Sequence, residues 1–145
     1  MEKVIRTLAE LDEEATRLVG ELVPGEGATL ITLTGELGAG KTAFTKSVAR
    51  VLGVDEVLTS PTFVLEKIYK LGSSTSKFKR LIHIDAYRLE SGKELAALGF
   101  DELLQDAGNL IMLEWPEKVA DTLPAPAVKI SILVEDDDAR VISYG

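Results

Sequence analysis

The sequence predicts one α/β domain whose central sheet is mixed, mostly parallel and flanked by helices. The chain has 145 residues, the size of a single ordinary domain. Hydrophobic residues make up 46% and charged residues 28%, the balance of a globular protein. Strand-length apolar runs alternate with segments of helical periodicity, and neither a repeat nor a linker divides residues 1–145.

The first half of the chain predicts two strands and two helices. A strand is expected over residues 3–8, followed by a helix that Asp12 caps. Pro24 begins the break after that helix, and residues 28–34 form a β-branched, apolar run typical of a strand buried on both faces. A glycine-rich turn follows, and then a second helix is expected over residues 41–52.

The second half predicts the rest of the sheet. Short helices are expected after Ser91 and over residues 101–104, and the acidic run 135–138 is interpreted as a solvated turn. The expected strands are residues 63–71 and 78–84, which form a hairpin, and residues 109–113, 127–134 and 140–143.

The glycine-rich turn carries the clearest functional motif. Residues 35–42, Gly-Glu-Leu-Gly-Ala-Gly-Lys-Thr, match the Walker A pattern G-x-x-x-x-G-K-[ST] between a buried strand and a helix. Glycines let consecutive N–H groups point at phosphate oxygens, and the helix adds the positive end of its dipole. Lys41 supplies a point charge for the outer phosphates, and Thr42 supplies a hydroxyl for magnesium. The motif predicts a P-loop NTPase domain that binds ATP and Mg²⁺ through Gly35, Gly38, Ala39, Gly40, Lys41, Thr42 and Ala43.

Two carboxylates at strand ends are candidates for the metal site. Residues 81–85 and 111–114 are apolar runs that end in Asp85 and Glu114. Strand ends at one edge of an α/β sheet converge on one crevice, so both acids are expected to face the magnesium. Which of them touches the metal directly stays open, and each could instead be a polar residue where a strand meets solvent. The predicted catalytic residues are Lys41, Asp85 and Glu114.

Composition argues against several other functions. A net charge of −8 disfavours tight nucleic-acid binding by the chain alone. The chain has no cysteine, which excludes disulfides and thiolate chemistry and suits a cytoplasmic protein. His83 is the only histidine and is interpreted as a strand residue with a local hydrogen bond. Neither a signal peptide nor a membrane-spanning run is visible, so no membrane association is expected.

Besides the P-loop, the chain carries three short motifs at residues 60–63 (Ser-Pro-Thr-Phe), 83–89 (His-Ile-Asp-Ala-Tyr-Arg-Leu) and 114–117 (Glu-Trp-Pro-Glu). In this order, the motifs resemble those of the bacterial TsaE (YjeE) family, the ATPase component of tRNA threonylcarbamoyladenosine biosynthesis. Two positions depart from the family pattern, which usually has Asp where Glu36 stands and Gly where Ser47 stands.

The resemblance implies roles for individual residues. It places Thr42 and Glu114 on magnesium, with Asp85 as the Walker B acid acting through water. It implies partnership with TsaB and TsaD proteins, in a complex that modifies adenosine 37 of tRNA, with tRNA met only through that complex. It also implies a switch-like loop of Ser60, Pro61, Thr62 and Phe63, a position near the nucleotide for Arg140, and adenine contacts from Glu13 or Thr16.

Other functions stay open. A P-loop small-molecule kinase would use residues 85–88 to hold a substrate hydroxyl, although no arginine-rich lid segment is visible. A nucleotide-dependent binding module would respond to ATP with little hydrolysis. A guanine-specific switch is disfavoured because Asn109, the only asparagine, is followed by leucine rather than by the Asn-Lys-x-Asp pattern. No motif supplies an arginine that must reach the terminal phosphate or a glutamine that orients the attacking water. We therefore expect slow ATP hydrolysis that partner proteins accelerate.

Overall fold

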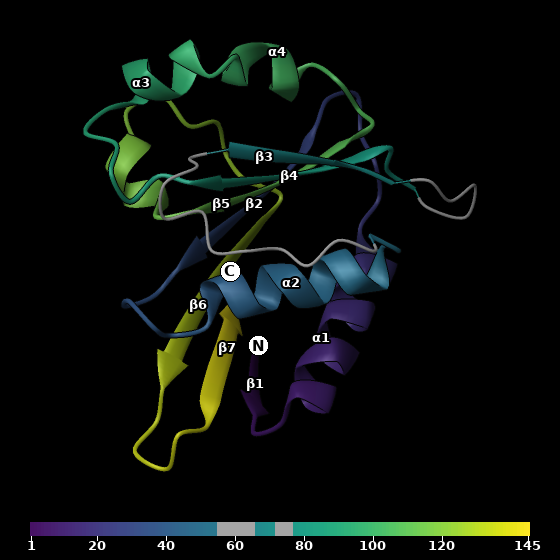
Figure 1. The fold of residues 1–145 in the computed structure, drawn as a ribbon, viewed down its shortest axis with the longest axis vertical. Helices are drawn as coiled ribbons and strands as arrows, with labels where there is room; N and C mark the ends of the chain where they lie inside the picture. The colour runs from purple at the N-terminus through teal and green to yellow at the C-terminus, as the bar shows by residue number, and fades with distance from the viewer. Residues whose placement is uncertain (55–65, 72–76) are drawn as a thin grey trace.

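The computed structural model describes residues 1–54, 66–71 and 77–145 as one α/β domain (Figure 1). Its strands are β1 (Glu2–Ile5), β2 (Thr29–Thr34), β3 (Glu66–Lys70), β4 (Arg80–Asp85), β5 (Asn109–Glu114), β6 (Val128–Val134) and β7 (Arg140–Tyr144). Its helices are α1 (Leu8–Glu21), α2 (Lys41–Val51), α3 (Gly92–Ala97) and α4 (Phe100–Leu104), with a 3₁₀ turn, η1 (Pro116–Val119). None of the helices in these ranges is long and apolar enough to cross a membrane.

The described strands form one mixed sheet in the order β1-β7-β6-β2-β5-β4-β3. The four central strands, β6, β2, β5 and β4, run parallel to one another. The outer strands are antiparallel to their neighbours, because β7 pairs with β6, β1 with β7, and β3 with β4. The predicted mixed, mostly parallel sheet is therefore confirmed, and the carboxyl ends of β2, β4 and β5 lie at one edge.

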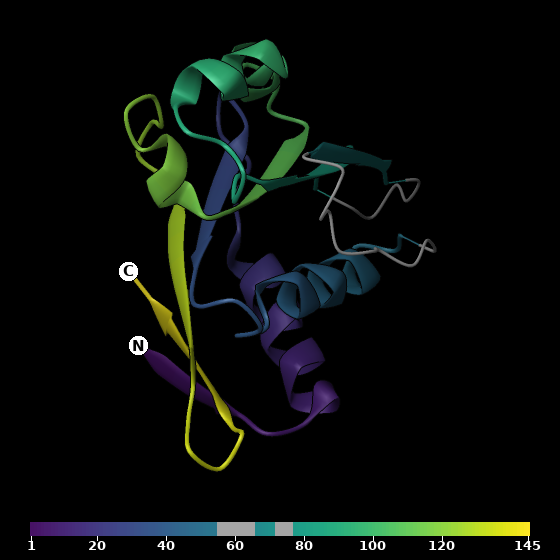
Figure 2. The same ribbon diagram turned by 60° about the vertical axis from the view of Figure 1, so that its left-hand side comes forward.

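Helices cover both faces of the sheet, so there are two apolar layers. One layer joins α1 and α2 to the sheet through residues such as Leu18 and Phe44. The other packs α3 and α4 against it through Leu95 and Phe100. Figure 2 shows β6, β7 and β1 extending away from α3 and α4. Strands β2 and β5 supply residues to both layers, which explains why their apolar residues do not alternate strictly with polar ones.

The predicted start of the first helix was wrong. β1 ends at Ile5 and α1 begins at Leu8, with Thr7 rather than Asp12 as its N-cap. The Thr7 Oγ1 accepts a hydrogen bond from the Glu10 N–H at 3.1 Å, and the Glu10 carboxylate accepts one from the Arg6 N–H at 3.2 Å. Asp12 therefore lies in the second turn.

Most other predicted elements agree with the structure to within a few residues. The β3–β4 hairpin is antiparallel as expected, and β5 continues through Glu114. Ser91 is the N-cap residue of α3, but its side chain makes no capping hydrogen bond. The predicted start of the hairpin at residues 63–65 and its tip at residues 72–76 lie outside the described residues.

Candidate functional site

The loop between β2 and α2 has the backbone conformation that its glycines allow. Gly35, Gly38 and Gly40 have φ angles of 153°, 80° and 112°, values that residues with a Cβ rarely adopt. A Cβ on Gly35 would also lie 2.6 Å from the carbonyl oxygen of Ile132. The loop turns directly into the N-terminus of α2, where free backbone N–H groups favour an anion.

The Lys41 side chain lies folded against this loop and is only 5% exposed. Its Nζ donates hydrogen bonds to the carbonyl oxygens of Gly35 and, at 3.0 Å, Glu36. The same atom lies 4.0 Å from the centre of the Trp115 ring, a cation–π distance. Burial lowers the pKa of Lys41, and the charge of Glu114 opposes that shift. The ammonium is thus held where the loop, the aromatic ring and the acidic strand end meet.

Thr42 and Glu114 are in direct contact. The Thr42 Oγ1 donates toward the two carboxylate oxygens of Glu114, at 3.1 and 3.3 Å. Glu114 is 3% exposed, and its Oε2 also lies 2.5 Å from the Nε2 of the fully buried His83. The Walker A hydroxyl and a strand-end carboxylate therefore share one buried polar cluster.

Asp85 ends the neighbouring strand, where it pairs in register with Glu114. Burial raises the pKa of Asp85 and the charge of Glu114 adds to this, while a 3.0 Å hydrogen bond from the Tyr87 N–H lowers it. The structure brings both predicted acids to the P-loop edge of the sheet, with Glu114 the one that contacts Thr42.

These oxygen donors fit a magnesium ion. Residues 1–54, 66–71 and 77–145 contain no group of three or more His, Cys, Asp or Glu side chains that could enclose a metal. Magnesium does not need such a cage, because it keeps several waters and is usually held by one or two carboxylates together with substrate phosphates. The Thr42 hydroxyl and the carboxylates of Glu114 and Asp85 are hard oxygen ligands of that kind.

A cavity of about 300 Å³ lies beside the P-loop. The guanidinium of Arg140 is brought to the loop, since its Nε lies 3.8 Å from the position that a Cβ on Gly40 would occupy. The Arg140 Nη1 donates to the Asp138 carbonyl at 2.7 Å. The cavity is lined by the β1–α1 connection, the start of α2 and the β6–β7 strands, in particular Thr7, Leu8, Leu11, Ala39, Gly40, Ala43, Ile132 and Arg140.

The two expected adenine contacts on α1 do not line this cavity. Glu13 and Thr16 are exposed, whereas Leu8 and Leu11 face it. Since Glu13 follows Leu11 by two residues, the two side chains point in different directions from the helix. The switch-like loop of residues 60–63 lies outside the described residues, so that assignment stays a prediction.

Two features of the site were missed by sequence reasoning. Tyr87 packs against Trp115 with ring centres 4.9 Å apart, next to the Lys41 ammonium. His83 on β4 contacts the Glu114 carboxylate on the neighbouring strand β5. A signal for the second feature was present, because His83 and Asp85 are two residues apart on a strand and so share a face.

Comparisons with known proteins agree on one family. The profile of the family described as threonylcarbamoyl adenosine biosynthesis protein TsaE matches residues 5–142. The chain is 40% identical to the tRNA threonylcarbamoyladenosine biosynthesis protein TsaE of Treponema pallidum, over 87% of each chain. It is 39% identical to the Rickettsia prowazekii protein of that name, over 79% of this chain and 75% of that one.

A solved structure has the same fold. The crystal structure of Bacillus subtilis YdiB superposes with a TM-score of 0.73 at 28% identity, covering 99% of this chain and 83% of that chain. The loop geometry, the strand-end acids and these matches lead to one conclusion. The chain belongs to the TsaE family of tRNA threonylcarbamoyladenosine biosynthesis, on a single-domain P-loop NTPase fold.

Proposed function

We propose that this chain is a Mg²⁺-dependent ATPase whose turnover drives the complex that adds threonylcarbamoyl to adenosine 37 of tRNA. The observation that carries the proposal is the meeting of Lys41, Thr42 and Glu114 at the mouth of the glycine loop. One cation, one hydroxyl and one carboxylate at the N-terminus of a helix are the parts that a nucleotide phosphate and its metal require.

Nucleotide binding would use the loop and the cavity together. Backbone N–H groups at the start of α2 would bind the phosphates, and Lys41 would exchange its two carbonyl contacts for phosphate oxygens. The cavity next to Gly40 has a volume suited to a purine base. Arg140 contributes a positive charge where base and phosphates would join.

The acids have distinct roles in this proposal. Glu114, already in contact with Thr42, would hold magnesium directly, and Asp85 would act through a water molecule. Bound magnesium supplies positive charge that stabilises negative charge developing on the transferred phosphoryl group. The raised pKa of Asp85 reflects burial beside a second carboxylate, a cost that a divalent cation would relieve.

The wider role follows from family membership. TsaB and TsaD proteins are the proposed partners, in the cytoplasm, and residues 60–63 are the proposed point at which they act. A net charge of −8 supports contact with tRNA through the complex rather than by the chain alone. We expect slow hydrolysis by the isolated chain, because transition-state donors supplied by a partner can be worth about 10³-fold or more in rate.

Steady-state phosphate release tests the proposal. The wild-type protein should hydrolyse ATP slowly with Mg²⁺ and faster with TsaB and TsaD added. Glu114→Gln should keep the fold and lose both magnesium dependence and turnover, because the amide keeps the shape but not the charge. Glu102→Gln is the control, an exposed acid on α4 away from the P-loop, and should behave like wild type.

Three outcomes would change the conclusion. Fast hydrolysis that partners do not alter would indicate a self-contained enzyme. Tight ATP binding without turnover, even with partners, would indicate a nucleotide-dependent binding module. If Asp85→Asn abolished turnover while Glu114→Gln did not, the two acids would have the reverse roles.

A further inference from the structure

His83 occupies an unusual place for an imidazole. It is the only histidine of the chain and is fully buried in β4, between strands β5 and β3 of the sheet. Its Nε2 contacts the Glu114 Oε2 at 2.5 Å, while its Nδ1 is buried with no hydrogen-bond partner among the described residues. A buried polar side chain is ordinarily hydrogen-bonded, and among the described residues the contact with Glu114 is the one that His83 makes.

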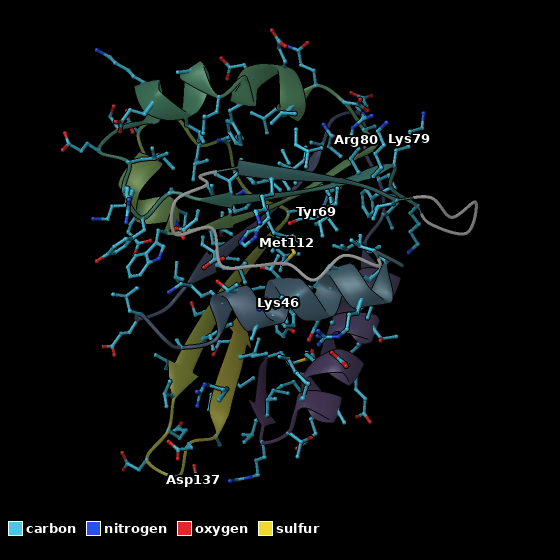
Figure 3. The ribbon with its side chains drawn as sticks, in the orientation of Figure 1. Lys46, Tyr69, Lys79, Arg80, Met112 and Asp137 are labelled. Atoms are coloured by element: carbon cyan, nitrogen blue, oxygen red, sulfur yellow. The ribbon has the colours of Figure 1, made fainter. Side chains whose placement is uncertain are left out.

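The sheet register fixes how His83 meets Glu114. Asp85 pairs directly with Glu114, and His83 pairs with Met112, two residues earlier on each strand. His83 and Asp85 share one face of β4 with Leu81, which packs in the apolar layer that contains α2 residues. Met112 lies in the apolar layer on that face, and Figure 3 shows it between the sheet and α2. The diagonal contact is therefore held by two central strands rather than by a loop.

The contact constrains the carboxylate. A carboxylate that binds a metal is ionised, and an ionised carboxylate only accepts hydrogen bonds. With Glu114 as a metal ligand, the donor in the contact is therefore Nε2 of His83. The Glu114 Oε2 then accepts a hydrogen bond from the His83 Nε2 and lies 3.1 Å from the Thr42 Oγ1. The Glu114 Oε1 lies 3.3 Å from the same hydroxyl. Two donors from different elements leave the carboxylate one orientation, with an oxygen directed at the P-loop.

We propose that His83 is a positioning residue that orients the Glu114 carboxylate toward the metal of the P-loop. This inference rests on the proposed function, since it takes Glu114 as a magnesium ligand. Carboxylates that bind metals are themselves hydrogen-bonded by outer partners, and loss of such a partner typically weakens metal affinity or activity by 10- to 100-fold.

One consequence can be observed without any variant or turnover. Because the chain has a single histidine, a long-range ¹H–¹⁵N NMR spectrum contains one imidazole to assign. The inference requires a hydrogen on Nε2. A ring protonated only on Nδ1 could not donate to Glu114, and that result would overturn the inference.

Substitution separates orientation from packing. His83→Phe keeps a planar ring and removes the donor, whereas His83→Gln keeps a donor. Calorimetric titration of Mg²⁺ into protein saturated with ADP should show a loss of about 10- to 100-fold in His83→Phe, largely recovered in His83→Gln. ADP affinity in EDTA should be the same as that of wild type in both, because the loop contacts are untouched. Met112→Leu, a change at the paired buried position, is the matched control.

The outcomes distinguish a failure of this inference from a failure of the proposed magnesium-dependent function. If magnesium does not strengthen ADP binding to the wild-type protein, the assigned metal role of Glu114 fails and the inference fails with it. If the wild-type protein requires magnesium but His83→Phe binds it equally well, only the inference is overturned. Equal losses with and without magnesium would assign His83 to packing and also overturn it. Should His83→Phe not fold, His83→Met provides a second variant without a donor, and the wild-type spectrum remains decisive.

Discussion

Lys41 shows how a single charged side chain is kept available at a buried site. Burial lowers its pKa, and the charges of Glu114, Glu117 and Asp85 act in the opposite direction. The cation–π contact with Trp115 and two carbonyl contacts replace much of the hydration that the ammonium loses. All of these partners are weaker than a polyphosphate, so the side chain is prepositioned for an anion without being fixed by an ion pair.

Arg140 can be tested at the same scale. Arg140→Ala should weaken ATP binding by about tenfold, the loss of roughly one charge-assisted hydrogen bond. The melting temperature of the nucleotide-free protein should hardly change, because among the described residues the partly exposed guanidinium donates to the Asp138 carbonyl of its own turn alone. Isothermal calorimetry and thermal melts on one preparation measure both quantities.

Controls make the Arg140 result specific. Arg50→Ala removes another partly exposed arginine, one that pairs with Asp12 and does not line the cavity, and should leave ATP affinity unchanged. Glu13→Gln should do the same if the cavity holds the base. Unchanged affinity in Arg140→Ala, or a loss in Glu13→Gln, would favour a nucleotide position nearer the middle of α1.

At the scale of elements, helix α1 depends on its first turn. Thr7→Ala removes the hydroxyl that accepts from the Glu10 N–H, which should lower the stability by about 1 kcal/mol. For a domain of this length that corresponds to a drop of about 2–4 °C in the melting temperature. The measurement uses nucleotide-free protein, since Thr7 also lines the cavity.

Thr16→Ala is the matched substitution within the same helix. Thr16 is exposed, and its hydroxyl donates a hydrogen bond to the Asp12 carbonyl one turn earlier. Thr16→Ala should therefore leave the stability unchanged or raise it slightly. Equal losses in the two variants would mean that the Thr7 cap contributes nothing of its own.

The same helix shows where sequence reasoning reached its limit. The P-loop was predictable because its glycines, Lys41 and Thr42 are contiguous and follow a buried strand. The cap was not, because Thr7 and Asp12 both suit an N-cap and residues 6–8 also continue a strand pattern. The choice depends on β1 ending at Ile5, where its pairing with β7 stops. Contacts that need tertiary placement, such as Arg140 beside Gly40, were accessible only through the family resemblance.

For the whole molecule, the candidate nucleotide site joins distant parts of the chain. Its cavity is walled by the β1–α1 connection, the start of α2 and the β6–β7 strands. The N- and C-terminal strands pair with each other, Glu2 opposite Ser143, so both ends of the chain contribute to one side of the site (Figure 1). Glu114 comes from the centre of the sheet. A ligand that contacts all these segments can form its contacts only when the whole domain is folded.

Thermal stability should therefore follow nucleotide concentration. A ligand that binds only the folded state stabilises it by about 2.7 kcal/mol at 100 times its Kd. For a domain of about 150 residues this raises the melting temperature by about 5–10 °C. The shift should require Mg²⁺ in part, and calorimetry with ADP at increasing concentration measures it.

Lys41→Ala tests whether the P-loop is the origin of that shift. The variant loses an ammonium whose partners in the described part of the chain are two carbonyl oxygens of its own loop and the Trp115 ring. Its nucleotide-free melting temperature should therefore stay near that of the wild type. Its midpoint for ADP should move to roughly 10- to 150-fold higher concentration, the equivalent of about 1.5–3 kcal/mol for a charge-assisted contact. A shift of normal size at normal ADP concentration would mean that the nucleotide stabilises the fold from another site. The P-loop would then be a structural turn, and the assignment of ATP to it would be withdrawn.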